Sequence, residues 1–187
     1  MKSFEEVYEI VKGELSEKRF HHSVCVMERC IEFAELYGED VEKAKLIGIA
    51  HDIAKEIPRE LRVKTAEEHG VILNEFEKEN LSLIHAKLGA KICEEKFGFS
   101  QDMCDAIAMH TTAKPNMTKL QKILYLSDYS EASRDYDGAI EAYEKGKQNL
   151  DDGYFMAIVG KIKCMLDMNI SIHYNSIDAY NDILKNR

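Results

Sequence analysis

The feature that most restricts the fold of this chain is the spacing of its apolar residues, which recur every three or four positions in nearly every segment. The first such run is Phe4, Val7, Val11 and Leu15. This spacing places side chains on one face of an α-helix, and no segment shows the sustained alternation typical of a β-strand. The sequence therefore predicts an all-α fold.

Flanking residues indicate where these helices end. A second stripe, from Phe20 to Ala34, stops at Gly38, a residue type that favours the left-handed conformation after a helix. A third, from Ala44 to His51, must finish by Pro58, because proline disfavours helix in the residue before it. Further helices are predicted over roughly Arg59 to His69 before Gly70, Leu81 to Ile92 before Gly98, Met103 to His110 after an N-cap at Ser100, Leu120 to Asp128, and Phe155 to Leu166.

Length and composition limit the architecture and the partners. Residues 1–187, with 45% hydrophobic and 32% charged residues, are predicted to form a single domain with a sizeable core. A net charge of -9 disfavours nucleic acid or an anionic membrane surface as a partner, since both need basic patches. The N-terminal segment mixes acids with apolar residues, so we expect no signal or membrane anchor and a cytoplasmic location. The five cysteines, with no C-x-x-C pair, are predicted to be reduced: Cys25, Cys30, Cys93, Cys104 and Cys164.

Four polar residues interrupt the apolar stripes. His51 continues the third stripe, His85 lies between Ile84 and Leu88, and His110 and Asp128 follow apolar residues at helical spacing. A single histidine on such a face is commonly a satisfied core residue. Four buried groups would each need a hydrogen-bond partner, whereas one shared metal centre satisfies them together. We therefore predict a metal site between the helices.

Asp52 and Lys55 extend this site. Adjacent residues on a helix diverge by about 100°, so His51 and Asp52 could bind a single ion together only if it lies to the side, between them. A carboxylate has two oxygens, and each oxygen of Asp52 could contact one ion, which admits a two-metal centre. Imidazole and carboxylate donors without thiolate suit iron, manganese, cobalt, nickel or zinc. Lys55 is either a solvated lysine near the helix end or a cation beside metal-bound phosphate.

An isolated histidine, a His-Asp pair, two further histidines and a late aspartate follow one another in the order found in HD-domain phosphohydrolases. Five segments of this chain resemble the YqeK-type members, which are bacterial hydrolases of symmetrical dinucleoside tetraphosphates. These segments are RFHHSVCV from Arg19, HDIAK from His51, HAKLGA from His85, AIAMHTT from Ala106 and KILYLSDYSEASR from Lys122. The family commonly has glycine after the paired threonines, where this chain has Ala113.

The resemblance implies an HD-domain helical bundle and a di-iron centre that cleaves diadenosine tetraphosphate into two molecules of ADP. In RFHHS the family histidine directly precedes the small hydroxyl residue, so His22 is chosen over His21. The implied metal ligands are His22, His51, Asp52, His85, His110 and Asp128.

Metal-assisted hydrolysis of a phosphoanhydride is the leading hypothesis, with Asp52 as the bridge between the ions. Lys55 and Arg134 are predicted to bind phosphate charge, and Thr111 and Thr112 to donate hydrogen bonds to it or to cap the local backbone. The alternatives are an HD-type nucleotidase or nucleoside-triphosphate hydrolase, an oxygen-using di-iron enzyme, and a metal-stabilised binding or sensor domain. Family habit makes a homodimer possible.

Overall fold

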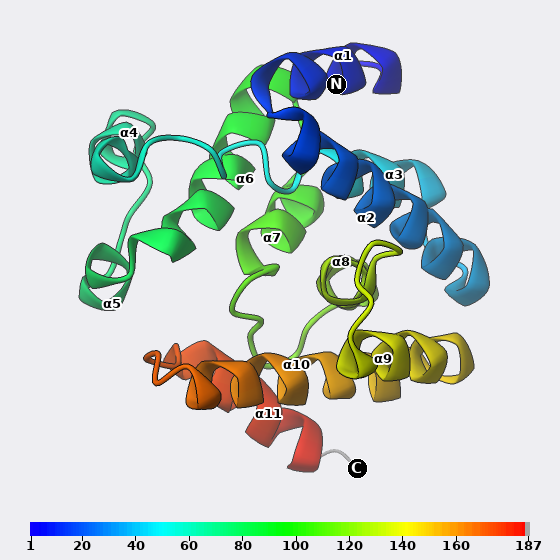
Figure 1. Ribbon diagram of the computed structural model, residues 1–187. Coiled ribbons are helices and arrows are strands. Elements are labelled where there is room, and N and C mark those ends of the chain that lie inside the picture. The colour runs from blue at the N-terminus through cyan, green and yellow to red at the C-terminus, as the bar shows by residue number, and fades with distance from the viewer. Residues whose placement is uncertain (186–187) are drawn as a thin grey trace.

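The protein is built from α-helices joined by short turns, as the computed structural model of residues 1–185 shows (Figure 1). No strand occurs among these described residues, which confirms the all-α prediction. The helices are α1 (Phe4–Glu14), α2 (Glu17–Tyr37), α3 (Val41–Ala50), α4 (Arg62–Glu68), α5 (Glu75–Glu79), α6 (Ile84–Phe97), α7 (Gln101–Met109), α8 (Lys119–Ser130), α9 (Asp137–Gln148), α10 (Leu150–Asp167) and α11 (Tyr174–Lys185), with 3₁₀ turns at Arg59–Leu61 and Leu81–Leu83.

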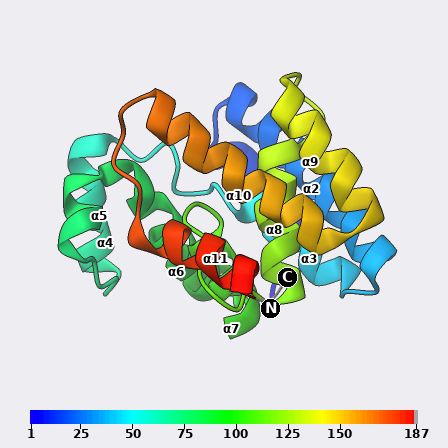
Figure 2. The ribbon, with the colours of Figure 1, turned by 90° about the horizontal axis from the view of Figure 1, so that it is seen from below.

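Helix α8 occupies the centre of the bundle. It packs against α2, α3 and α7 on one side and against α9 and α10 on the other. Figure 1 shows it between these two groups of helices, and Figure 2, seen from below, shows α10 crossing it. A residue near the end of α8 can therefore meet side chains from both halves of the molecule.

The predicted helix ends are largely confirmed. Gly38 and Gly98 follow α2 and α6 with φ angles of 61° and 71°, the left-handed conformation that glycine adopts without steric cost. Ser100 occupies the N-cap position of α7. The predicted helix after Pro58 forms as a 3₁₀ turn followed by α4, and it stops before Gly70.

The third helix is shorter than predicted. It ends at Ala50, and the residues from His51 to Glu56 form tight turns. The amide of Ile53 donates to the Ala50 carbonyl, and the amide of Lys55 donates to the Asp52 carbonyl, at 3.1 and 2.8 Å. These bonds span three residues instead of four, so the α-helical ladder is not continued. The placement of Asp52 and Lys55 on a regular helix was wrong.

Two buried faces differ in part from the predicted apolar stripes. In α2, Met27 and Ala34 of the stripe are buried as predicted, and Val26, Cys30 and Phe33 are buried beside them, because this helix packs against α3 and α8 at once. In α10, Ile158 is buried as predicted together with Tyr154 and Ala157, in the half that lies against α8 and α9, whereas Leu166 is 59% exposed. Helices α9 and α11 were not predicted as such. None of the described helices is long and apolar enough to cross a lipid bilayer.

We predict that Gly48→Ala destabilises the protein by about 1–3 kcal/mol, the range for forcing extra atoms into a packed contact. A Cβ atom at Gly48 would lie 2.6 Å from the Met27 Cα, so α2 and α3 would have to separate. Urea denaturation followed by circular dichroism measures the change.

The matched control is Gly13→Ala, in α1, where no atom lies within 4 Å of the added carbon. This change should stabilise the helix by about 0.5–1 kcal/mol. Equal unfolding free energies for the two variants would contradict the close-packing explanation.

Candidate metal centre

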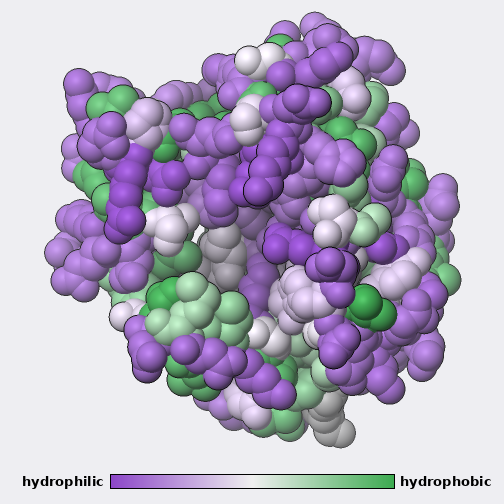
Figure 3. Space-filling model, in the orientation of Figure 1, coloured by the Kyte–Doolittle hydropathy of each residue, from purple (hydrophilic) through white to green (hydrophobic). Residues whose placement is uncertain are grey.

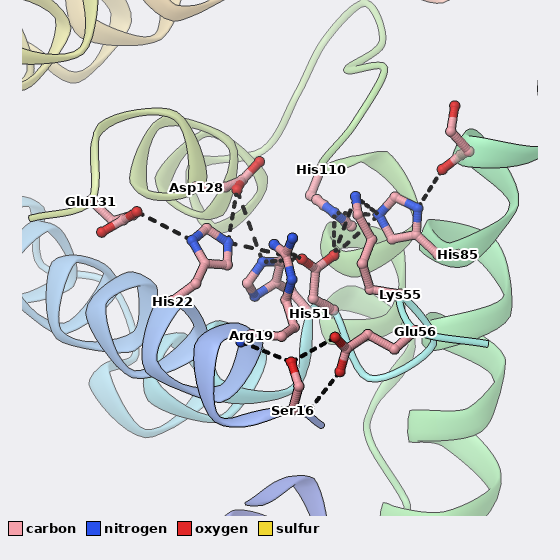
Figure 4. Close-up of polar contacts among 12 residues, drawn as sticks. Ser16, Arg19, His22, His51, Lys55, Glu56, His85, His110, Asp128 and Glu131 are labelled. Atoms are coloured by element: carbon pink, nitrogen blue, oxygen red, sulfur yellow. Dashed lines mark hydrogen bonds and ion pairs between the residues drawn. The ribbon is translucent and has the colours of Figure 1, made fainter. Parts of the chain in front are cut away.

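The six predicted ligands converge on one buried region, and Figure 4 labels all of them except Asp52. They come from five elements: α2 supplies one histidine, the turn after α3 supplies the His-Asp pair, and α6, α7 and α8 supply one residue each, with the α7 residue at the helix C-cap. All are buried or nearly so in the described structure: His22, His51, Asp52, His85, His110 and Asp128. The sequence prediction that these side chains share one site is therefore consistent with their positions.

One group of donors surrounds the Oδ2 atom of Asp52. The Nε2 atoms of His22 and His51 lie 3.9 and 3.6 Å from it. Asp128 closes this group, since its Oδ1 atom lies 3.3 Å from the His22 Nε2 and 4.0 Å from the His51 Nε2. Two histidines thus face one oxygen of Asp52, and Asp128 lies against both of these histidines.

A second group surrounds the other oxygen, Oδ1, of Asp52. The Nε2 atoms of His85 and His110 lie 3.1 and 3.5 Å from it, and 3.2 Å from each other. The donor atoms of His22, His51 and Asp52 lie within 4.8 Å of one another, and so do those of Asp52, His85 and His110, which is compatible with one ion in each group. Asp52 belongs to both groups, with one oxygen in each.

Backbone carbonyls fix the orientation of three of these rings. The Nδ1 atoms of His51, His85 and His110 lie 2.8, 2.6 and 2.7 Å from the carbonyls three residues earlier. His22 differs, because its Nδ1 lies 3.2 Å from the Oε1 of buried Glu131. With a proton on Nδ1 in these bonds, each Nε2 is left as a lone-pair donor facing the cluster, the arrangement usual for metal-binding imidazoles.

The donor atoms fit a divalent metal. His22 Nε2, His51 Nε2 and Asp52 Oδ1 are buried without a hydrogen-bond partner. Leaving such groups unpaired costs about 1–3 kcal/mol each, a cost that coordination would remove. Imidazole nitrogen and carboxylate oxygen suit first-row divalent ions.

The protonation states agree with this fit. Burial lowers the pKa of His51 to about 4, so its ring is neutral near pH 7. Burial alone would raise the pKa of Asp52, but positive charge beside it, including Lys55 at 3.9 Å, holds the pKa well below its usual value. Asp52 is consequently a carboxylate and His51 an unprotonated imidazole, the forms that bind metal ions.

Cationic side chains border the carboxylates. Arg19 Nη1 lies 3.0 Å from Asp52 Oδ2, and Lys161 Nζ lies 3.2 Å from Asp128 Oδ2. Lys55 Nζ is 3.9 Å from Asp52 Oδ1 and 3.1 Å from the His85 Nε2. Arg134 Nη2 is 3.7 Å from an Asp128 oxygen. A multiply charged anion reaching the cluster would meet positive charge on both sides of Asp52.

Comparison with known proteins agrees with this donor pattern. The family model described as HD domain matches residues 19–133, which contain all six converging residues. The chain belongs to the HD-domain family. It is 34% identical to the symmetrical bis(5'-nucleosyl)-tetraphosphatase of Halalkalibacterium halodurans, over 94% of each chain, and 32% identical to that of Bacillus subtilis, over 95% of each.

A solved structure shares the whole fold. The crystal structure of a predicted HD superfamily hydrolase involved in NAD metabolism, from Clostridium acetobutylicum, superimposes with a TM-score of 0.94. The two chains are 32% identical, and the match covers all of both. The HD-domain bundle predicted from the sequence is therefore confirmed.

The predicted phosphate contacts divide into two kinds. Lys55 and Arg134 lie beside the cluster, and Thr111 lines a cavity together with Asp128 and Arg134. The Thr112 side chain is only 7% exposed, and its hydroxyl donates to the Ala113 carbonyl at 3.2 Å. In this structure Thr112 serves the local backbone, which is the capping alternative that its sequence position allowed.

Three residues at the site were missed as functional candidates. Arg19 lies three positions before His22, so helical spacing could have indicated it. Glu131 lies three positions after Asp128 and could have been noticed in the same way. Lys161 carries no comparable signal, because it comes from α10, 33 residues after Asp128.

We predict that His22→Ala and His85→Ala each reduce the bound divalent metal by about one equivalent per chain, since each removes a donor from a different group. His21→Ala is the matched control, because His21 is exposed next to His22 and outside both groups. Elemental analysis of anaerobically purified protein gives the metal content. Full metal content in His22→Ala, or equal loss in His21→Ala, would contradict the assignment.

Acidification should destabilise the metal-free protein. The folded pKa of His51 is about 4, below the unfolded value of 6.5, so the unfolded chain binds more protons between these values. The contribution of His51 to the free energy of unfolding is fully present above pH 6.5. It decreases by roughly 3 kcal/mol as the pH drops towards 4. Urea denaturation of chelator-treated protein from pH 7.5 to 4.5 tests this, and His51→Gln should show a shallower pH slope than the wild type.

Proposed function

We propose that this protein hydrolyses symmetrical dinucleoside tetraphosphates, with diadenosine tetraphosphate giving two molecules of ADP. The observation that carries the proposal is the pair of buried donor groups that share Asp52 and have cations on both sides. The names of the Halalkalibacterium halodurans and Bacillus subtilis relatives support the substrate class. An HD-type nucleotidase is the alternative that product analysis must separate.

The reaction adds water across the central phosphoanhydride. The water oxygen bonds to one of the two central phosphorus atoms, the bond from that phosphorus to the bridging oxygen breaks, and the second ADP leaves with that oxygen. Two divalent ions would activate the water and neutralise phosphate charge. We propose that these ions are iron, with manganese, cobalt, nickel or zinc as alternatives. Their ligands would be His22, His51, Asp52, His85, His110 and Asp128.

The cations of the chain favour cleavage at the middle of the substrate. Lys55 adjoins the His85 side of the cluster, and Arg134 and Lys161 adjoin the Asp128 side. A tetraphosphate centred on Asp52 therefore meets at least one cation on either side of the bond that breaks. Lysine as a point charge and arginine as a planar fork both suit phosphate oxygens.

Glu131 positions His22. Its Oε1 accepts from the Ser133 hydroxyl at 2.6 Å, and its Oε2 accepts from the Ser133 amide at 2.6 Å. Arg134 Nε lies 3.4 Å from the same carboxylate. Burial would raise the pKa of Glu131, but bonds to His22 and Ser133 hold it at about 2, so it is an anion facing the His22 ring.

Other properties stay predictions within this proposal. These are a cytoplasmic location, a single domain and a homodimer, the last resting on family habit. Light scattering of the purified protein measures the oligomeric state directly. The metal identity follows from the elemental analysis described above.

We predict that Asp52→Ala lowers kcat for diadenosine tetraphosphate by about 10³-fold or more and that Lys55→Gln lowers it by about 10²-fold, because each removes preorganised charge at the reacting phosphates. Lys64→Gln is the matched control, since Lys64 is a surface lysine whose side chain is 74% exposed. Chromatography of the products separates the hypotheses. Two ADP per substrate supports the proposal, whereas ATP with AMP, or phosphate released mainly from mononucleotides, would contradict it.

A further inference from the structure

A cavity of about 620 Å³ opens beside the cluster, between the end of α8, the turn that follows it and the C-terminal half of α10. We call it the α8–α10 cavity. Asp128 and Arg134 line one part of it, so it is continuous with the candidate metal centre. The face of the molecule that is turned to the viewer in Figure 1 is hollowed near its centre (Figure 3).

The remaining walls are mainly aromatic and thioether side chains, and the charged residues Lys163 and Asp167 of α10 also contribute to them. Tyr129 and Tyr136 line one side, with ring centroids 5.7 Å apart and planes at 82°, and the Tyr136 hydroxyl donates to the Tyr129 carbonyl at 3.1 Å. Met165 and Met168 from the α10 side also line it. Tyr136 is 41% exposed and Met168 62% exposed, unusually open for such large apolar groups beside a charged site.

The shape of the walls depends on one glycine. A Cβ atom at Gly160 would lie 1.9 Å from the Tyr129 hydroxyl oxygen, so only glycine lets this tyrosine lie against α10. Tyr129 is itself nearly buried, at 7% exposure. The aromatic wall is thus held in place before any ligand arrives.

Positive charge gathers at the end of the cavity nearest Asp128. Lys161 Nζ is fixed 3.2 Å from the Asp128 Oδ2, 3.2 Å from the His110 carbonyl oxygen and 4.1 Å from the centre of the Tyr125 ring. Arg134 lies on the other side of the same carboxylate. The cavity is therefore cationic at one end and mainly apolar along its walls.

We propose that the α8–α10 cavity binds one nucleoside of the substrate, with its base against Tyr129, Tyr136 and the two methionines and its phosphates directed past Arg134 and Lys161 towards Asp128. This inference rests on the proposed function and adds the location of one nucleoside. A flat, weakly polar base suits aromatic and thioether walls, and the volume lies within the usual range of about 300–1,000 Å³ for small-molecule sites.

Another cavity, of about 500 Å³, fits this role less well. It is lined by Asp151, Asp152 and Asp182 besides two lysines, and one of these lysines, Lys122, is paired with Asp151 at 2.6 Å. It shares no residue with the cluster, so a nucleoside bound there would not bring its phosphates to Asp52.

Cys164 provides a direct probe. It lines the α8–α10 cavity and is exposed, whereas the other four cysteines are buried. Burial also raises the pKa of two of these buried thiols, Cys30 to about 12 and Cys104 to about 11. A maleimide should therefore label Cys164 selectively in the folded protein.

The experiment measures the rate of Cys164 labelling in metal-loaded, full-length protein. Two ligands are tested: ADP, and a diadenosine tetraphosphate analogue with a methylene group at the central bridge. At saturating ligand, each should slow labelling of Cys164 by about tenfold or more. Calorimetry gives the ligand concentration that saturates the protein. Inorganic tripolyphosphate, which has no base, should leave the rate within about twofold. ADP that does not bind at millimolar concentration, or that binds without slowing labelling, would overturn the inference.

A variant pair gives a second test. Cys164→Trp should raise KM for diadenosine tetraphosphate by about tenfold without loss of metal, because it fills the cavity. Leu166→Trp, on the same helix and outside the lining, should leave KM unchanged. An unchanged KM in Cys164→Trp would count against the inference. If no dinucleoside polyphosphate is hydrolysed the proposed function fails, while protection by ADP would still place a nucleoside here.

Discussion

The buried carboxylate of Asp52 is the interaction on which the rest of the site depends. It is only 2% exposed, and two histidine pairs face its two oxygens. An isolated ionised carboxylate in such a place would be strongly unfavourable. The Arg19 guanidinium offsets part of that cost, and the fit of both donor groups to divalent ions explains why the fold concentrates so many polar groups here.

Helix ends explain how the histidine rings are held. The last carbonyls of a helix lack partners within the helix. His51 and His110 follow directly after α3 and α7, and their Nδ1 atoms contact the carbonyls of Gly48 and Ile107, which lie in the last turns of these helices. The same bond therefore gives a helix-end carbonyl a side-chain partner and orients a ring towards the cluster. The early end of α3 at Ala50, which the sequence did not reveal, contributes directly to the site.

Ala113 shows how a departure from the family pattern is accommodated. Its φ angle is 57°, in the left-handed region where the YqeK-type proteins commonly have glycine. A non-glycine residue in that conformation costs about 1–2 kcal/mol. Full burial of the Ala113 side chain against the core offsets part of this cost.

The sequence by itself determined the all-α class and most helix ends, because apolar periodicity and glycine positions reflect local backbone preference. It also determined the six residues that converge, because the HD pattern marks these polar residues among apolar ones. Only the tertiary structure decided which further residues of α2 and α10 are buried, the pairing of Glu131 with His22 and the approach of Lys161 to Asp128. These depend on how helices distant in the sequence pack around α8. Spacing within one helix carries no information about which side chain of another helix will face it, so the α8–α10 cavity could be seen only in the folded chain.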